Sequence, residues 1–193
     1  MEEKDVLEIF HQNHALLTGH FKLSSGLHSQ HYMQCALVLQ HPGIAEKLAK
    51  EIAKKFAKKE IDFVIGPALG GITLAYEVAK ALKVRGLFTE RQEGTMVLRR
   101  GFSISKDERA LVVEDVITTG GSTKEVVELV RNAGGIVVGV ASIIDRSESP
   151  VNFGTPFTSL ARIKIETYKE ADCPFCKLKL PITKPGSRPA PKN

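Results

Sequence analysis

Two adjacent acids and a glycine loop rich in hydroxyl groups stand together in this 193-residue chain. The acids, Glu114 and Asp115, end a short β-branched apolar run that is typical of a buried strand. Residues 118–123, Thr-Thr-Gly-Gly-Ser-Thr, come next and lead into a helical pattern. Glycine lets the backbone approach an anion closely, hydroxyls donate hydrogen bonds, and the first N–H groups of a helix point outward. We therefore predict that this loop holds a phosphate monoester.

The two acids need a different ligand, because carboxylates repel phosphate. They suit a pair of sugar hydroxyls or a bound metal ion, so the whole arrangement indicates a ribose 5-phosphate site. Other nucleotide-binding loops fit the sequence less well. The Rossmann pattern G-x-G-x-x-G is absent, and the nearest approach to a Walker A loop, at residues 66–73, has Ile72 where the lysine belongs.

Composition narrows the class of protein further. With 42% hydrophobic and 25% charged residues, the chain is predicted to form one soluble α/β domain with at most a small appendage. A net charge of +5 suits anionic ligands, but no basic cluster is interleaved with aromatic residues, so we expect no nucleic acid partner. We expect no membrane association either, because no run approaches the roughly 18 apolar residues of a membrane span. The odd count of three cysteines, and a start unlike a signal peptide, favour the cytoplasm.

Hydrophobic spacing predicts strands and helices that alternate along the chain. Helices are expected over residues 2–17, 43–59, 72–82 and 124–132, and strands over residues 61–65, from 111 to the acid pair, 84–89, 136–144 and, at an edge, 157–166. A hairpin is expected over residues 19–32, and a loop or hairpin that can move over residues 90–102. This order predicts a doubly wound, mostly parallel α/β sheet with a small N-terminal hood. A second glycine loop, residues 66–71, also follows a strand, and open α/β sheets bind ligands at that edge.

The central stretch, residues 111–123, resembles the phosphoribosyl-diphosphate (PRPP) signature of type I phosphoribosyltransferases. Over about residues 5–170 the chain most resembles the orotate phosphoribosyltransferases of that family. The resemblance implies transfer of phosphoribose from PRPP to a nucleobase, with Mg²⁺ bound mainly through PRPP and not by protein ligands. It also implies a homodimer in which the lid, residues 90–102, closes over the neighbouring subunit's site.

The resemblance assigns site residues to three roles. PRPP binding is implied for Ala68, Leu69, Gly70, Gly71, Arg91, Glu114, Asp115, Val116, Ile117, Thr118, Thr119, Gly120, Gly121, Ser122 and Thr123. A cis peptide bond between Ala68 and Leu69 is part of this expectation. Catalysis is implied for Glu114, Asp115 and the lid arginines Arg91, Arg99 and Arg100. Orotate binding is implied for Ser24, Tyr32, Thr118 and Arg146. The guanidinium of Arg146 suits a planar anion, because it can donate two parallel hydrogen bonds.

Two alternatives stay open. Three positions that are basic in many orotate enzymes are Ser24, Gly70 and Gln92 here, so another nucleobase is a possible substrate. The other alternative is a non-catalytic PRPP-sensing regulator, which would keep the central stretch and lose turnover. Such a regulator needs a nucleic-acid-binding face or domain, and the sequence offers neither.

The chain changes character after residue 170. We predict a phosphoribosyltransferase domain over residues 1–170, including the hood, and a tail over residues 171–193 that contains cysteine and proline. Cys173 and Cys176 supply half a zinc site, which only distant residues or another subunit could complete, so a reduced structural pair is preferred. The histidines from His11 to His31 have no nearby metal-binding pattern and are expected to be solvated or capping. Beyond Gly186 we expect disorder.

Overall fold

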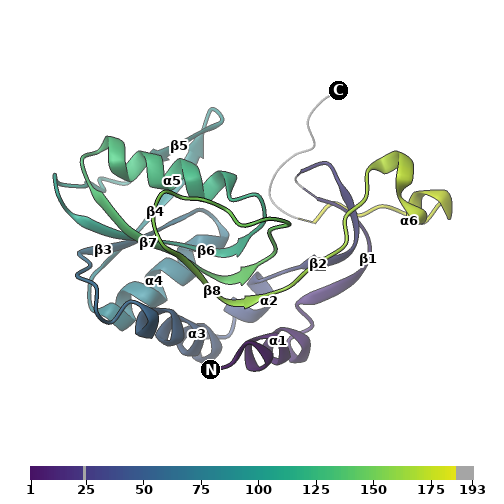
Figure 1. Cartoon of the computed structure of the whole chain (residues 1–193), viewed down its shortest axis with the longest axis horizontal. Helices are drawn as coiled ribbons and strands as arrows, with labels where there is room; N and C mark the ends of the chain where they lie inside the picture. Colours follow the sequence, from purple (N-terminus) through teal and green to yellow (C-terminus); the bar gives the residue numbers. More distant parts are fainter. Residues whose placement is uncertain (24, 186–193) are drawn as a thin grey trace.

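A six-stranded sheet forms the centre of the computed structural model, which describes residues 1–23 and 25–185 (Figure 1). The predictions for Ser24 and for the chain beyond Gly186 lie outside these residues. The strand order is β5-β4-β3-β6-β7-β8. The strands are β3 (Phe63–Pro67), β4 (Arg85–Gln92), β5 (Thr95–Leu98), β6 (Arg109–Ile117), β7 (Ile136–Asp145) and β8 (Phe157–Arg162). All neighbours pair in parallel except β5, which returns antiparallel to β4. The predicted sheet is confirmed.

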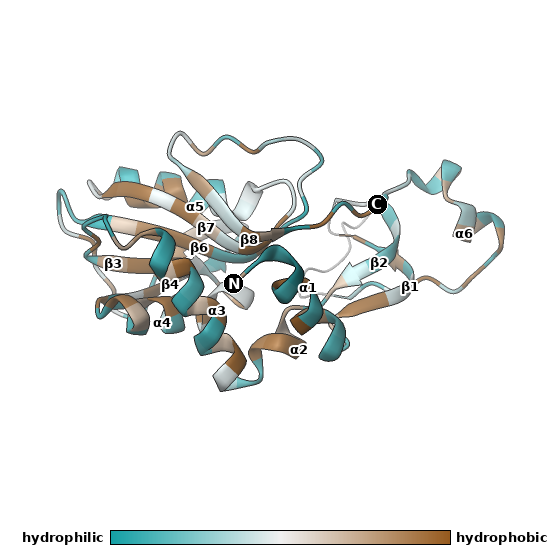
Figure 2. Cartoon of the chain, turned by 60° about the horizontal axis from the view of Figure 1, so that its bottom comes forward, coloured by the Kyte–Doolittle hydropathy of each residue, from teal (hydrophilic) through white to brown (hydrophobic). Residues whose placement is uncertain are grey.

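Helices cover both faces of the sheet, as a doubly wound fold requires (Figure 1). The helices on the sheet side of the molecule are α1 (Glu3–Gln12), α2 (Ala36–Leu39), α3 (Pro42–Lys55), α4 (Gly70–Leu82) and α5 (Gly121–Asn132). The short α6 (Pro174–Lys177) and a 3₁₀ turn at Glu170–Asp172 lie beside the hood, away from the main sheet (Figure 1). One core lies under α1 to α4 and a second lies under α5. Within β3, Val64 faces the first core, whereas Phe63 and Ile65 face the second. Because both faces are buried, the central strands are largely apolar along their middle, as the brown stretches of Figure 2 show.

Several boundaries differ from the prediction. The first helix ends at Gln12 and not at residue 17, because the backbone turns at His14, with φ of +50°, and β1 begins at Leu16. Helix α3 ends at Lys55, before the lysines at its predicted end. The short helix α2 was not predicted. Of the two forms predicted for residues 90–102, the structure shows the hairpin, formed by the end of β4 and by β5. The expected edge strand is β8, which ends at Arg162 and not at residue 166.

A separate two-stranded sheet forms the predicted hood from β1 (Leu16–Lys22) and β2 (His28–Met33). The C-terminal segment pairs with this hairpin at two points, Phe21 with Thr183 and His28 with Tyr168. This segment buries His20 and His28, so the expectation of solvated or capping histidines was wrong for these two. Across the described residues, no helix is long and apolar enough to cross a bilayer.

Candidate active site

The candidate site lies at the carboxyl ends of β3, β6 and β7, where the parallel sheet leaves its loops side by side. Strand β6 carries Glu114 and Asp115 to this edge. Asp115 Oδ1 accepts a hydrogen bond from the Val116 N–H at 2.8 Å, and Glu114 Oε2 accepts one from Thr123 Oγ1 at 3.3 Å. The second bond ties the acid pair to the first turn of α5.

Burial shifts the pKa of both acids upward. Desolvation raises the pKa of Glu114 well above its usual value, and the neighbouring charge of Asp115 raises it further. Desolvation also raises the pKa of Asp115. A half-buried, desolvated carboxylate pair gains stability from any positive charge or hydroxyl donor that a ligand brings. The pair can therefore accept hydrogen bonds from two hydroxyls and stabilise positive charge beside it.

The loop after β6 has the geometry of an anion site. Gly120 caps α5 with φ of +74°, a left-handed conformation that favours glycine. A Cβ at this residue would lie 2.7 Å from Val151 Cγ1, so close packing also demands glycine. Thr118 and Thr119 are exposed in front of the helix, and Thr119 Oγ1 accepts a 3.4 Å hydrogen bond from the Gly121 N–H. Exposed hydroxyls and N–H groups at a helix start suit a phosphate.

The loop after β3 touches the acid pair. A Cβ at Gly70 would lie 2.5 Å from Asp115 Oδ2, so only glycine leaves the carboxylate in its present position. The expected cis peptide bond between Ala68 and Leu69 is present. The Ala68 N–H donates to the Thr89 carbonyl at 2.8 Å, and the Leu69 side chain is 71% exposed. The two glycine loops thus flank one space, with the acids between them.

Arg146 approaches the same space from the end of β7. Its backbone N–H donates to the Ile117 carbonyl at 2.8 Å, and the buried Nε has no hydrogen-bond partner among the described residues. Burial lowers the pKa of Arg146, and the nearby Tyr32 and Cys35 oppose that shift. Burial raises the pKa of Tyr32, Asp115 raises it further, and Arg146 lowers it. The hood therefore brings Tyr32 within electrostatic reach of both Arg146 and Asp115.

The lid arginines are placed differently from one another. Arg91 Nη2 pairs with Glu125 of α5 at 2.9 Å, and its guanidinium also donates to the Gly94 carbonyl, so it lies near the phosphate loop. Arg100 donates two hydrogen bonds of 2.7 Å to Glu90 at the base of the hairpin. Arg99 is exposed. Among the described residues, no hydrogen bond or ion pair joins Arg99 or Arg100 to the acid pair.

Comparison with known proteins decides the family. The model of the phosphoribosyl transferase domain matches residues 37–171, which is more than half of the chain. The chain belongs to the phosphoribosyltransferase family. Orotate phosphoribosyltransferase of Caldanaerobacter subterraneus subsp. tengcongensis is 56% identical over 188 residues, 97% of this chain and 99% of the relative. That of Thermoanaerobacter sp. is 54% identical over the same shares of both chains. The crystal structure of orotate phosphoribosyltransferase from Aeropyrum pernix matches with a TM-score of 0.70 at 25% identity, covering 82% of this chain and 93% of that one.

The structure adds two contributors that the sequence analysis of this phosphoribosyltransferase missed. Cys35 is buried at the start of α2, and burial, followed by the charges of Asp115 and Glu114, raises its pKa well above the usual value. It therefore borders the acid pair as a neutral thiol. Val151 and Phe153 pack against Gly120 and so support the phosphate loop. Neither signal is local in the sequence, because both contacts come from segments that lie well outside the central stretch, residues 111–123.

Proposed function

We propose that this phosphoribosyltransferase converts orotate and PRPP to orotidine 5′-monophosphate and pyrophosphate, a step of pyrimidine biosynthesis. The observation that carries the choice of base is Arg146, which lies near Tyr32 and the acid pair. Its buried Nε has no hydrogen-bond partner among the described residues. A guanidinium with an unused donor suits a carboxylate or carbonyl of a planar base. Relatives more than 50% identical over nearly the whole chain carry the same name, which supports the proposal.

The two glycine loops divide PRPP between them in this proposal. Residues 118–123 hold the 5′-phosphate at the start of α5, and residues 68–71 face the pyrophosphate. Glu114 and Asp115 accept hydrogen bonds from the ribose hydroxyls. Binding energy from the phosphate positions the reactive carbon, so the protein needs no side-chain nucleophile.

Rate acceleration in this site is electrostatic. Positive charge develops on the ribose as pyrophosphate leaves, and a desolvated acid pair stabilises that charge more than it stabilises the ground state. The carboxylate oxygens are hard donors of the kind that Mg²⁺ prefers, so a magnesium ion bound mainly through PRPP fits the charge of the site. Magnesium supplies charge neutralisation of the leaving pyrophosphate. We propose that the reaction takes place in the cytoplasm, because the odd count of three cysteines suits a reducing compartment.

We further propose that the lid acts on a second copy of the chain in a homodimer. The pairing of Arg100 with Glu90, and the absence among the described residues of a hydrogen bond or ion pair from Arg99 or Arg100 to the acid pair, support this, because these charges would act near a leaving pyrophosphate. Closure would exclude the water that hydrolyses PRPP. Mixing Asp115→Asn chains with Arg99→Ala/Arg100→Ala chains should restore activity that neither has alone, because a mixed dimer contains one intact site. No restoration under conditions of subunit exchange contradicts a shared lid.

An absorbance assay with Mg²⁺, PRPP and a single nucleobase tests the function. We expect loss of orotate with release of pyrophosphate, and no reaction with uracil, hypoxanthine or adenine. Arg146→Ala should raise the KM for orotate and leave the KM for PRPP nearly unchanged. Arg85→Ala is the matched control, since Arg85 pairs with Glu108 on the surface. Turnover of a different base would mean that this base, and not orotate, is the substrate. PRPP binding without turnover of any base would favour the non-catalytic PRPP-sensing regulator.

A further inference from the structure

Four metal-binding side chains converge at the junction of the hood and the C-terminal segment. His20 of β1 and His28 of β2 meet Cys173 and Cys176, and one ligand atom from each lies within 4.8 Å of all the others. Cys173 Sγ and Cys176 Sγ lie 3.5 Å and 3.7 Å from His20 Nε2. His28 Nδ1 lies 3.1 Å from His20 Nε2 and 3.2 Å from Cys176 Sγ. Both cysteines are free thiols.

These separations match the edges of a zinc tetrahedron. Zinc binds sulfur at about 2.3 Å and nitrogen at about 2.0–2.1 Å, so its four ligand atoms stand about 3.3–3.8 Å apart. The four measured separations run from 3.1 Å to 3.7 Å. We propose that His20, His28, Cys173 and Cys176 bind one zinc ion in a closed structural site that joins the hood to the C-terminal segment.

The surroundings of the two imidazoles support metal binding. The other ring nitrogen of His20, Nδ1, lies 3.0 Å from the Leu180 carbonyl, and that of His28, Nε2, lies 3.9 Å from the Glu170 carboxylate. Metal-binding histidines usually donate their second N–H to a carbonyl or carboxylate, which leaves the first nitrogen with a free lone pair. The carbonyl acceptor beside His20 Nδ1 leaves His20 Nε2 to face the thiols. In His28, Nδ1 faces Cys176, whereas the buried Nε2 points toward the Glu170 carboxylate without a hydrogen-bond partner among the described residues.

Hydrogen bonding alone accounts poorly for the cluster. His20 Nε2 has three polar neighbours within 3.7 Å, although one ring nitrogen offers a single proton or a single lone pair. Three of the four residues are buried and Cys176 is half-buried, so water cannot supply every missing partner. One cation at the centre satisfies all four atoms together. Four protein ligands leave no open position, which indicates a structural role and not a catalytic one.

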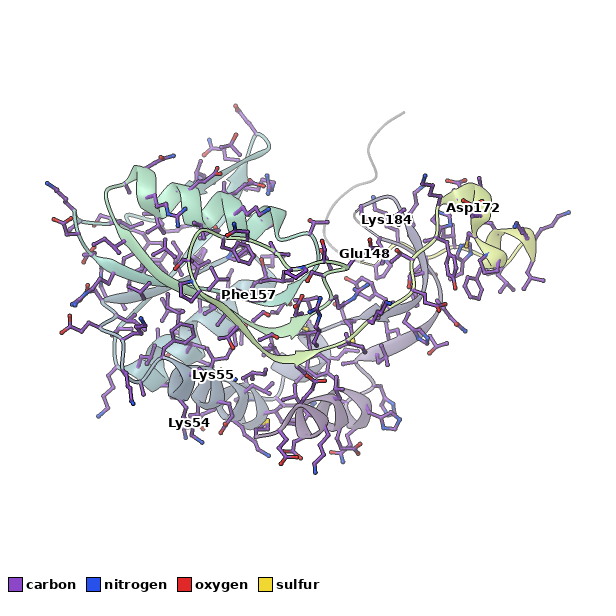
Figure 3. The ribbon with its side chains drawn as sticks, in the orientation of Figure 1. Lys54, Lys55, Glu148, Phe157, Asp172 and Lys184 are labelled. Atoms are coloured by element: carbon purple, nitrogen blue, oxygen red, sulfur yellow. The ribbon has the colours of Figure 1, made fainter. Side chains whose placement is uncertain are left out.

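The cluster lies in a small lobe made of the hood hairpin, β1 and β2, and the C-terminal segment that pairs with it. This lobe has little apolar core of its own. The hood hairpin is a two-stranded ribbon, and such ribbons are marginally stable alone. The segment packed on it exposes Leu178, Leu180 and Ile182 at 69%, 46% and 46%. Asp172 marks this segment at the side of the molecule away from the main sheet (Figure 3). A metal is a common staple for a lobe of this size. It would also stabilise the strand that carries Tyr32 to the base site.

Elemental analysis of the full chain, purified without a metal-affinity tag, tests the site independently of the proposed activity. We expect one zinc ion per chain. The pair Cys173→Ser/Cys176→Ser should lose nearly all of it, whereas Cys35→Ala should keep it. His28→Ala should lose the metal, and His11→Ala, which changes an exposed histidine, should keep it.

A cobalt spectrum covers the case in which the cysteine or histidine variants do not fold. Replacing zinc by Co²⁺ in the unmodified chain should produce the visible bands of tetrahedral cobalt together with thiolate charge transfer. Zinc that survives the cysteine changes would overturn the ligand assignment. A reduced protein that binds neither zinc nor cobalt, a Cys173–Cys176 disulfide with no metal uptake after reduction, or bound iron would each overturn the proposal.

Discussion

Replacing Gly70 with alanine tests whether the Asp115 carboxylate must stay where the structure places it. A Cβ at residue 70 would lie 2.5 Å from Oδ2 and 3.0 Å from Oδ1 of Asp115. The nearest atoms belong to a short side chain and not to the backbone, so the carboxylate moves and the loop stays. Gly70 is also the first residue of α4, a position where alanine is a good helix former.

Two opposing terms leave stability nearly unchanged. Alanine in place of glycine favours a helix by about 0.5–1 kcal/mol. Moving the Asp115 carboxylate breaks its 2.8 Å hydrogen bond from the Val116 N–H, which costs about 1 kcal/mol. The free energy of unfolding should therefore change by less than about 1 kcal/mol. Catalysis has no such compensation. Losing one charge-assisted hydrogen bond to a ribose hydroxyl costs about 1.5–3 kcal/mol, which is a fall of about 10- to 150-fold in kcat/KM.

The assay pairs urea unfolding with kcat/KM for PRPP at saturating orotate. Gly43→Ala is the matched control, because Gly43 also lies in the first turn of a helix, α3, and a Cβ there meets nothing within 4 Å. The control should keep both stability and kcat/KM. Wild-type kcat/KM in Gly70→Ala would refute the importance of the carboxylate position. A loss of stability large enough to unfold the variant would refute the structural argument instead.

Three further predictions concern the base, the phosphate loop and the acid pair. Arg146→Ala should raise the KM for orotate about 10- to 100-fold, and Arg146→Lys should not restore it, because an ammonium cannot donate two parallel hydrogen bonds; steady-state kinetics check this. Gly120→Ala should lower the free energy of unfolding by about 2–4 kcal/mol, since it adds the 2.7 Å clash with Val151 to the strain of φ +74°. In the control Gly101→Ala, φ is +75° but the space is open, so the free energy of unfolding should fall by only about 1–2 kcal/mol. Urea denaturation of both variants checks this difference. Burial raises the pKa of Glu114, so the contribution of this residue to stability is greatest below its unfolded pKa and is lost as the pH rises through the folded pKa. Glu114→Gln removes that loss, so the ligand-free variant should unfold at higher temperature than wild type near pH 8 and at the same temperature near pH 4, and equal melting temperatures at both would contradict it.

The sequence by itself determined the sheet, most of its helices and the placement of the acid pair directly before the loop that begins α5. Residues 111–123 combine strand, acids, loop and helix start within one continuous stretch, so spacing alone fixes their relative positions. The glycine loop after β3 was equally visible, because parallel strands bring their carboxyl ends to one edge. Local chain geometry accounts for both successes.

Only the tertiary structure decided which distant residues meet. Arg100 turns away to Glu90, and Arg91 pairs with Glu125, because the β4–β5 hairpin folds back as a pair of strands. His20 meets Cys173, which lies 153 residues later in the chain, and the sequence carries no sign of this contact. Taken alone, His20 is an ordinary histidine, and the C-x-x-C pattern of Cys173 and Cys176 is only half a zinc site. Periodicity describes how a segment presents its own faces, whereas contacts between segments depend on how the whole chain packs.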